Sequence, residues 1–424
     1  MKADDLSFEV CSSVWLELTW LKPIYPDPRE SVAEMRRRAA EGKERRERWA
    51  EQMAREGRTI WQVTEEINQR FGMPKLRRQM EATGRLPSLG TWNWYDARFM
   101  IAECLGAPPP EWDDQTHSWW QERTHYMDTV RSVADVRAIP IPDWPRTKPV
   151  ARMLASHARW MEAFPDDGGG WGITYYLTLP GGGAVKSINY PAFVDLGLFL
   201  MGATRFLEIL GGDREMADAL MDKCFELSTS YTEFILSLKE ESFDALCGFG
   251  GDVTCMLSPR LFDRYGASWD ARLFEYVQKV HHAPADIPCN YHSCGPSVHL
   301  YEKWGRHPHR QNITTLQTRL MPGTVRKLRE NMPDTYLELT IHPQHFDLAE
   351  QPPERVAAVL WETARDAGFH DLHITLIAVA HEPKQLDRLE TSLCVCRDTL
   401  TEINEYIAEG AMALERSGPC FEPG

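Results

Sequence analysis

Hydrophobic positions recur with two different periods in the second half of the chain. From position 213 onward, short apolar runs alternate with longer segments whose apolar residues return at helical spacing. The short runs predict strands at 242–249, 287–291, 312–317, 336–341 and 372–379. The longer segments predict helices at 214–240, 258–281 and 353–367, and another that begins near 322. Strands that alternate with helices in this way indicate a parallel sheet.

The N-terminal region follows a helical pattern. Ile60, Val63, Ile67 and Phe71 recur at helical spacing, so the segment 28–72 is expected to be helical. Its arginines and glutamates fit a solvated helix face with ion pairs better than a basic arm that binds a partner. We therefore expect residues 1–80 to form a helical N-terminal extension and residues 81–424 to form the main domain.

Polar side chains follow most of the predicted strands. Asp252, His292, Arg319, His342 and His381 each lie at or just after the C-terminal end of a strand. A doubly wound sheet is one fold that alternating strands and helices can form. A (β/α)8 barrel of the TIM type is favoured, because the strand ends of a barrel converge on one mouth, where active sites lie.

Charge and composition narrow the class of function. The 424-residue chain has a net charge of -15, which disfavours binding to nucleic acid. No apolar run is long enough to predict a membrane-spanning helix, and the first residues lack a signal-peptide pattern. The scattered cysteines suit free thiols in a reducing compartment. We expect a cytoplasmic enzyme with a small-molecule substrate, and the sequence leaves open whether it forms a homodimer.

His292 and Cys294 are the sharpest candidate site. Alternate residues of an extended segment point the same way, so this pair at a strand end can hold one metal ion together. Zinc suits nitrogen and sulfur ligands, and a catalytic zinc site keeps one position open. The competing interpretation is a buried thiol beside a surface histidine. His381 is the first candidate for a third ligand because strand ends converge, and His342 is a further candidate.

Other polar and aromatic residues complete the predicted site. Asp252 can act as a general acid or base, or can stabilise a turn. Glu382 can ligate the metal or hold a ligand histidine, and it joins Asp252 as a candidate catalytic residue. Arg319 can bind a substrate anion or form a surface salt bridge. The candidate pocket-lining residues, which can also pack in the core, are three aromatic residues of an expected first strand at 89–95: Trp92, Trp94 and Tyr95.

Several motifs resemble those of the uroporphyrinogen decarboxylase superfamily. The segment Gly251-Asp252-Val253-Thr254, followed by Leu257-Ser258-Pro259-Arg260-Leu261-Phe262, resembles its acidic strand end and Ser-Pro-x-x-Phe helix start. His292-Ser293-Cys294-Gly295 is similar to the His-x-Cys-Gly segment of its methyltransferase branch. The stretch 133–143 and Asp195-Leu196-Gly197 extend the likeness, which spans roughly residues 85–407.

The resemblance implies a (β/α)8 barrel and a metal-dependent methyltransferase. In that branch, zinc held by His-x-Cys and a later Cys binds a thiol, which takes a methyl group from a methyl-corrinoid protein. His292 and Cys294 would then be ligands, and Asp252 an active-site carboxylate. His381 stands where the later cysteine is expected. The ion, zinc or another transition metal, therefore stays open, as do the methyl donor and the acceptor.

The alternative function is a metal-independent decarboxylase or lyase that acts on an aromatic or tetrapyrrole-like carboxylate. The decarboxylase branch carries an Arg-rich N-terminal segment, and the corresponding residues 86–95 lack that pattern. A non-catalytic corrinoid or porphyrin carrier is a third interpretation. The sequence shows no Asp-x-His-x-x-Gly corrinoid motif, so a corrinoid would arrive on a partner protein or bind at the barrel mouth.

Overall fold

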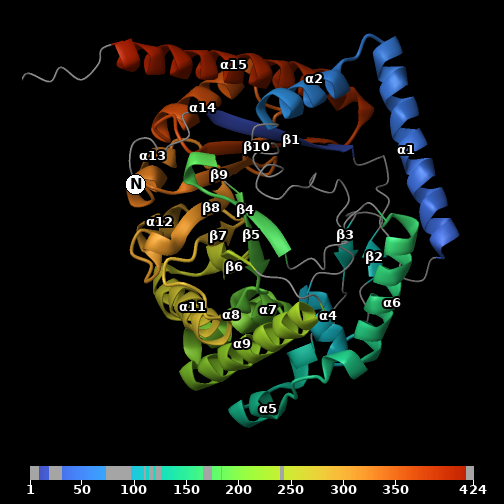
Figure 1. Cartoon of the computed structure of the whole chain (residues 1–424), viewed down its shortest axis with the longest axis vertical. Coiled ribbons are helices and arrows are strands. Elements are labelled where there is room, and N and C mark those ends of the chain that lie inside the picture. The colour runs from blue at the N-terminus through green and yellow to red at the C-terminus, as the bar shows by residue number, and fades with distance from the viewer. Residues whose placement is uncertain are drawn as a thin grey trace, which may run out of the picture.

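One eight-stranded sheet forms the centre of the fold (Figure 1). The computed structural model describes residues 9–18, 31–72, 97–108, 111–113, 118–120, 126–165, 174–182, 184–238 and 243–416. The strands lie in the order β1-β10-β9-β8-β7-β6-β5-β4. Their bounds are β1 Val10–Leu18, β4 Thr174–Thr178, β5 Ala184–Asn189, β6 Ala245–Gly250, β7 Cys289–Ser293, β8 Ile313–Arg319, β9 Tyr336–Ile341 and β10 Leu372–Ala380. A separate antiparallel pair is formed by β2 Glu111–Asp113 and β3 Ser118–Trp120.

Over the described residues, the sheet is curled but does not close into the predicted (β/α)8 barrel. Neighbouring strands are parallel except β4 and β5, which are antiparallel. The short turn Pro180–Gly182 joins these two strands, and such a short connection can only reverse the chain. In the part of the chain that the structure describes, β1 and β4 are the two edges and do not pair with each other. The fold is therefore a mixed α/β, TIM-like half-barrel with one antiparallel edge strand.

The strand–helix alternation predicted for the second half is confirmed. Strands β6 to β10 each fall on a predicted apolar run. The helices before, between and after them are α9 Arg214–Ser237, α10 Pro259–Leu261, α11 Ser268–His281, α12 Tyr301–Trp304, α13 Val325–Asn331, α14 Pro353–Asp366 and α15 Leu386–Arg416. The hydroxyl of Ser258 accepts a hydrogen bond from the backbone N–H of Leu261 and so caps the α10 turn.

The N-terminal region contains the expected helices and one unexpected strand. The helices are α1 Val32–Arg55 and α2 Ile60–Ile67, and α2 continues into a π-helical turn at Asn68–Gly72. Strand β1 lies before them and pairs in parallel with β10 along its whole length. The side chain of Asn68 accepts the backbone N–H of Val14 at 2.7 Å. Residues before position 80 therefore contribute an edge strand of the sheet in addition to the expected helices.

The remaining helices surround the β4–β5 side of the sheet. They are α4 Ala97–Cys104, α5 Val133–Ala138, α6 Lys148–Ala163, α7 Phe193–Met201 and α8 Ala203–Gly212. Helices α1 and α6 lie side by side at one edge of the molecule (Figure 1), where Arg36 Nη2 donates to the carbonyl of Glu162 at 2.7 Å. Helix α6 thus contacts both α1 and α4.

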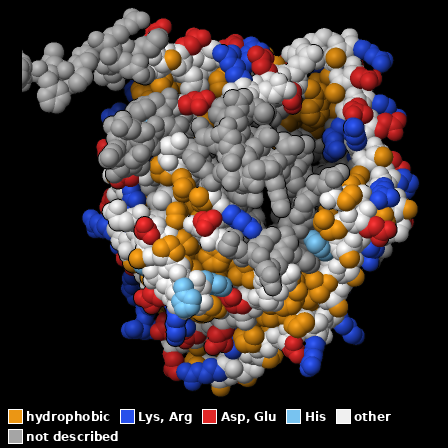
Figure 2. Space-filling model, viewed as in Figure 1, with side chains coloured by type: hydrophobic (Ala, Val, Ile, Leu, Met, Phe, Trp, Pro, Cys, Tyr) orange, Lys and Arg blue, Asp and Glu red, His pale blue; other side chains and the backbone are white. Residues whose placement is uncertain are grey.

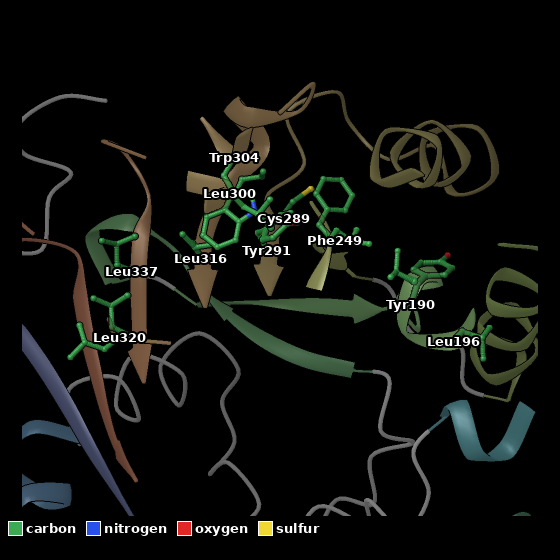
Figure 3. Close-up of a cluster of buried hydrophobic side chains, with 14 of the residues drawn as sticks. Tyr190, Leu196, Phe249, Cys289, Tyr291, Leu300, Trp304, Leu316, Leu320 and Leu337 are labelled. Carbon is green, nitrogen blue, oxygen red and sulfur yellow. The ribbon is translucent and has the colours of Figure 1, made fainter. Parts of the chain in front are cut away.

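The core lies between the sheet and the outer helices. Tyr291, Leu316 and Leu337 come from three neighbouring strands and face the same side of the sheet, where Trp304 packs on Tyr291 (Figure 3). All four side chains are buried. Successive side chains of a strand point to opposite faces. The residues next to Tyr291, Leu316 and Leu337 in the sequence therefore face the concave side of the sheet.

Charged side chains of both signs are mixed along the outline of the face drawn in Figure 2. Among the described helices, none combines the length and the apolar composition that crossing a bilayer requires.

Candidate metal site

The site forms where β6 and β7 end side by side. Gly250, the last residue of β6, pairs with His292 of β7. Asp252, two residues beyond the end of β6, therefore lies beside His292. Cys294 follows β7 directly and projects to the same side as His292. The carboxyl ends of two adjacent parallel strands thus bring these three side chains together.

The three side chains converge on one ring nitrogen. His292 Nε2 lies 2.9 Å from Asp252 Oδ1 and 2.7 Å from Cys294 Sγ. The three potential ligand atoms all lie within 4.8 Å of one another. The side chain of His292 is 29% exposed and that of Asp252 is 41% exposed, and Cys294 is exposed as well. An ion or small molecule can therefore reach the group.

Gln317 of β8 fixes the orientation of the His292 ring. Its Oε1 lies 2.7 Å from His292 Nδ1. An amide oxygen only accepts hydrogen bonds, so Nδ1 of His292 carries the proton. The protonated ring donates its second proton, on Nε2, to Asp252, whereas the neutral ring leaves a lone pair on Nε2 that a metal ion can take. Metal-binding histidines commonly have this arrangement, in which a polar partner on the second nitrogen fixes the tautomer.

Asp195 of α7 and Arg98 of α4 hold Asp252 in place. The carboxylate of Asp195 accepts the backbone N–H groups of Asp252 at 2.8 Å and of Val253 at 3.1 Å. Arg98 Nη1 lies 3.1 Å from Asp252 Oδ2 and 3.2 Å from Asp195 Oδ2. Arg98 therefore engages the carboxylate oxygen of Asp252 that faces away from His292. The other oxygen, Oδ1, points to the site.

Two glycines permit the backbone to pass this close. Gly251 has a φ of +152°, and a Cβ there would lie 2.5 Å from Asp195 Oδ1. Gly250 has a φ of +74°, and a Cβ there would lie 2.4 Å from the carbonyl oxygen of His292. Both backbone conformations favour glycine. The Gly250-Gly251 pair is therefore required for Asp252 to contact both Asp195 and His292.

The charges of the site shift the pKa values of its members in opposite directions. The hydrogen bond from His292 is the main cause that holds the pKa of Asp252 well below its usual range, against the effect of burial. Burial by itself lowers the pKa of His292, but Asp252 and Cys294 together raise it well above its usual value. Burial, followed by the charge of Asp252, raises the pKa of Asp195 to about 6 although Arg98 opposes the shift.

The three donors fit a divalent transition metal. Imidazole nitrogen, thiolate sulfur and carboxylate oxygen are the ligand types that zinc takes in proteins. Asp252 and the thiolate of Cys294 would together carry two negative charges, which match a divalent cation. Three protein ligands leave a further position of a tetrahedral ion for another molecule.

The other predicted ligand histidines lie apart from this group in the described chain. His342 follows β9, where its Nδ1 accepts the backbone N–H of Gln344 at 3.2 Å. Burial, then the nearby charges of Arg319 and His345, lowers the pKa of His342. His381 follows β10, is exposed, and donates its backbone N–H to Gln385 Oε1 at 2.7 Å. Neither histidine belongs to the three-residue group.

Glu382 and Arg319 also make contacts outside the group. Glu382 caps the short turn Pro383–Gln385 and lies 2.5 Å from Lys384 Nζ. Arg319 Nη1 lies 2.9 Å from Gln344 Oε1 at the mouth of the half-barrel. The predicted pocket residues, together with the expected strand 89–95, lie outside the described residues: Trp92, Trp94 and Tyr95.

Three residues that support the site were not predicted as site residues: Arg98, Asp195 and Gln317. Asp195 carried a signal, because it belongs to a segment, Asp195-Leu196-Gly197, that was noted in the sequence as a resemblance. Gln317 carried a weaker signal, as a polar residue near the end of a predicted strand. Arg98 had none, since it reaches Asp195 and Asp252 from 97 and 154 positions away in the sequence.

Comparisons with known proteins give distant likenesses among solved structures. The chain matches no family model and no curated protein. Among solved structures it is similar to a methyltransferase from Methanosarcina mazei, with 14% sequence identity and a TM-score of 0.47. The alignment covers 92% of this chain and 94% of that chain. This likeness is too distant to assign a reaction.

Proposed function

We propose that Asp252, His292 and Cys294 bind one divalent transition metal, zinc in the first place. The observation that carries the proposal is the convergence of Asp252 Oδ1 and Cys294 Sγ on a single atom, Nε2 of His292. In this proposal Asp252 replaces His381 and His342 as the third ligand, because Asp252 is the residue that reaches the pair.

The same geometry disfavours a metal-free nucleophilic cysteine. In a catalytic triad, the base contacts the nucleophile through one ring nitrogen and the orienting carboxylate through the other. Here both the thiol of Cys294 and the carboxylate of Asp252 face Nε2 of His292, and Gln317 occupies Nδ1. Ligands that surround one ion have this arrangement, and a proton relay does not.

For the reaction, we propose methyl transfer between a corrinoid and a small-molecule acceptor, with a thiol as the leading acceptor. The segment His292-Ser293-Cys294-Gly295, which resembles the methyltransferase branch, supports this proposal. A bound metal lowers the pKa of a thiol and supplies a thiolate nucleophile at neutral pH. The cobalt of the corrinoid would keep the electron pair of its bond to the methyl group. The methyl group would then bond to the acceptor sulfur, and the thiol proton would pass to solvent.

Each residue of the site has a distinct part in this proposal. The charges of Asp252 and Cys294 neutralise a divalent ion, so an acceptor thiolate keeps its electron density for attack. Gln317 orients the His292 ring, and Arg98 and Asp195 fix the Asp252 carboxylate. We expect the corrinoid to arrive on a partner protein or to bind from solution.

Metal binding is tested by elemental analysis and by cobalt substitution. We expect about one zinc per purified chain, and about none in His292→Ala or Cys294→Ala. Cobalt-substituted protein should show a thiolate-to-cobalt charge-transfer band that disappears in Cys294→Ala and persists, at weaker affinity, in Asp252→Ala. Cys104→Ala is the matched control, because Cys104 lies outside the site and bonds to Thr147. Wild-type protein that binds neither metal would overturn the proposal.

Methyl transfer is tested with methylcobalamin and simple thiols. The absorbance change of cobalamin should report demethylation by wild-type protein, and chelation should abolish it. A decarboxylase or lyase predicts instead that activity on aromatic carboxylates survives chelation. Turnover of such a carboxylate by metal-free protein would favour that alternative.

A further inference from the structure

A row of polar side chains crosses the concave side of the half-barrel at the level of His292. The strand register pairs His292 of β7 with Gln317 of β8, Gln317 with Glu338 of β9, and Glu338 with His373 of β10. Register-paired residues of a parallel sheet point to the same face. His292 and Gln317 are bonded to each other on the concave face, so Glu338 and His373 share it.

The opposite face confirms this direction. Tyr291, Leu316 and Leu337, the neighbours in sequence of the first three row members, are buried on the helix side of the sheet (Figure 3). Ser13 of β1 extends the row at its far end, where its hydroxyl lies 2.9 Å from His373 Nε2. The polar row therefore continues from the candidate metal site to the edge strand.

Glu338 is the charged member of the row beyond the metal site. It is half-buried, and its charge contributes to raising the pKa of the Cys247 thiol, for which burial is the main cause. Cys247 belongs to β6, so the charge of Glu338 acts as far as the strand that precedes Asp252. Neighbouring strands lie about 4.8 Å apart, so the backbone of Glu338, two strands away, is about 10 Å from that of His292. Both side chains point to the concave side.

Two arginines near this row are each held by other side chains. Arg98 is engaged by both Asp195 and Asp252. Arg319, two residues after Gln317, is the next residue of β8 that faces the concave side, and it contacts Gln344 and His345. A carboxylate has about four lone-pair sites, so Glu338 can accept a ligand donor in addition to its protein contacts.

We propose that Glu338, flanked by Gln317 and His373, forms a subsite for an ammonium group of the substrate. The reacting atom of that substrate binds at the metal, so this inference rests on the proposed function. The substrate class is an aminothiol or a similar amine-bearing acceptor. Its carbon chain must span the distance between the metal ligands and the Glu338 carboxylate.

Thiol binding to the cobalt-substituted protein separates this proposal from the proposed function. The probes are mercaptoethanol, mercaptopropionate and a series of aminothiols of increasing chain length that starts with cysteamine. Each titration follows the cobalt spectrum at low ionic strength. We expect the best aminothiol to bind about tenfold more tightly than mercaptoethanol, the effect of one partly screened ion pair, and mercaptopropionate to bind most weakly.

Glu338→Gln keeps the shape of the side chain and removes its charge. We expect this variant to bind mercaptoethanol and cobalt as the wild type does, and to lose the aminothiol preference. Glu302→Gln is the matched control, since Glu302 is exposed on α12 and pairs with Lys327. Equal affinities for aminothiols and mercaptoethanol in the wild type, or a preference that persists in Glu338→Gln, would overturn the subsite. A cobalt spectrum that no thiol changes would instead overturn the proposed thiol acceptor, and the subsite with it.

Discussion

The side-chain oxygen of Gln317 lies 2.7 Å from Nδ1 of His292, on the opposite side of the ring from Asp252 and Cys294. Loss of such a partner typically weakens metal binding 10- to 100-fold. We therefore expect Gln317→Leu to bind zinc about 10- to 100-fold more weakly while it stays folded. Competition with a chromophoric chelator measures this. Gln344→Leu is the control, because Gln344 is exposed and contacts Arg319; unchanged affinity in Gln317→Leu would contradict the role of Gln317.

The Gly251 backbone provides a second test of the site. Alanine at this position adds a Cβ 2.5 Å from Asp195 Oδ1 and keeps an unfavourable φ. We expect Gly251→Ala to lower the free energy of unfolding by about 1–3 kcal/mol or more, and to weaken zinc binding as well. Urea denaturation and metal titration measure the two effects. Gly57→Ala is matched in positive φ but has open space around it, so it should cost about 1–2 kcal/mol from the left-handed backbone alone and leave zinc binding intact.

Zinc itself should stabilise the folded protein. A ligand that binds only the native state adds about 2.7 kcal/mol at about 100 times its Kd. We expect the melting temperature of the wild type to rise with free zinc and to fall after chelation. In the double variant Asp252→Ala/Cys294→Ala, zinc should not change the melting temperature. An equal zinc response of both proteins would show that the ion binds elsewhere.

The turn between β4 and β5 is attached to the base of β10 through Asp371. Its Oδ1 accepts the backbone N–H of Gly181 at 2.9 Å, and the side chain is fully buried. We expect Asp371→Ala to cost about 1–3 kcal/mol of unfolding free energy, because a buried donor loses its acceptor.

Asp371→Asn separates this hydrogen bond from the backbone conformation of the same residue. Asp371 has a φ of +45°, which asparagine tolerates, and asparagine keeps a side-chain oxygen. The asparagine variant should therefore be the more stable of the two in urea denaturation. An equal loss in Asp371→Asn and Asp371→Ala would mean that the charge of Asp371, and not its acceptor oxygen, holds the turn.

The sequence predicted the β6–β10 part of the fold well because these strands are apolar and separated by well-formed helices. Strand β1 was not predicted, since Cys11, Ser12 and Ser13 interrupt its apolar pattern and its partner β10 lies at the other end of the chain. Closure of the barrel was predicted wrongly. The short turn after β4 reverses the chain, and a strand pattern does not show the direction of the strand.

The candidate site was only partly predictable for a related reason. His292 and Cys294 are two positions apart, so their shared direction follows from strand geometry alone. Asp252 was predicted as catalytic, but its contact with His292 depends on the pairing of β6 with β7. Gln317 reaches His292 through the register of β7 with β8. Contacts between different strands do not correspond to a recognisable spacing of residues in the sequence.

The unclosed sheet has a consequence for how this scaffold can be re-engineered. A closed barrel has a circumference fixed by its strand number and shear. In the described part of the chain, the arc ends at β1 and β4, so no continuous ring of hydrogen bonds locks its width. Directed evolution can therefore vary the size of the interior through inward-facing residues of the outer strands. Asp252, His292 and Cys294 lie on or directly after the central strands β6 and β7, so changes in the outer strands leave the geometry of the site unaltered.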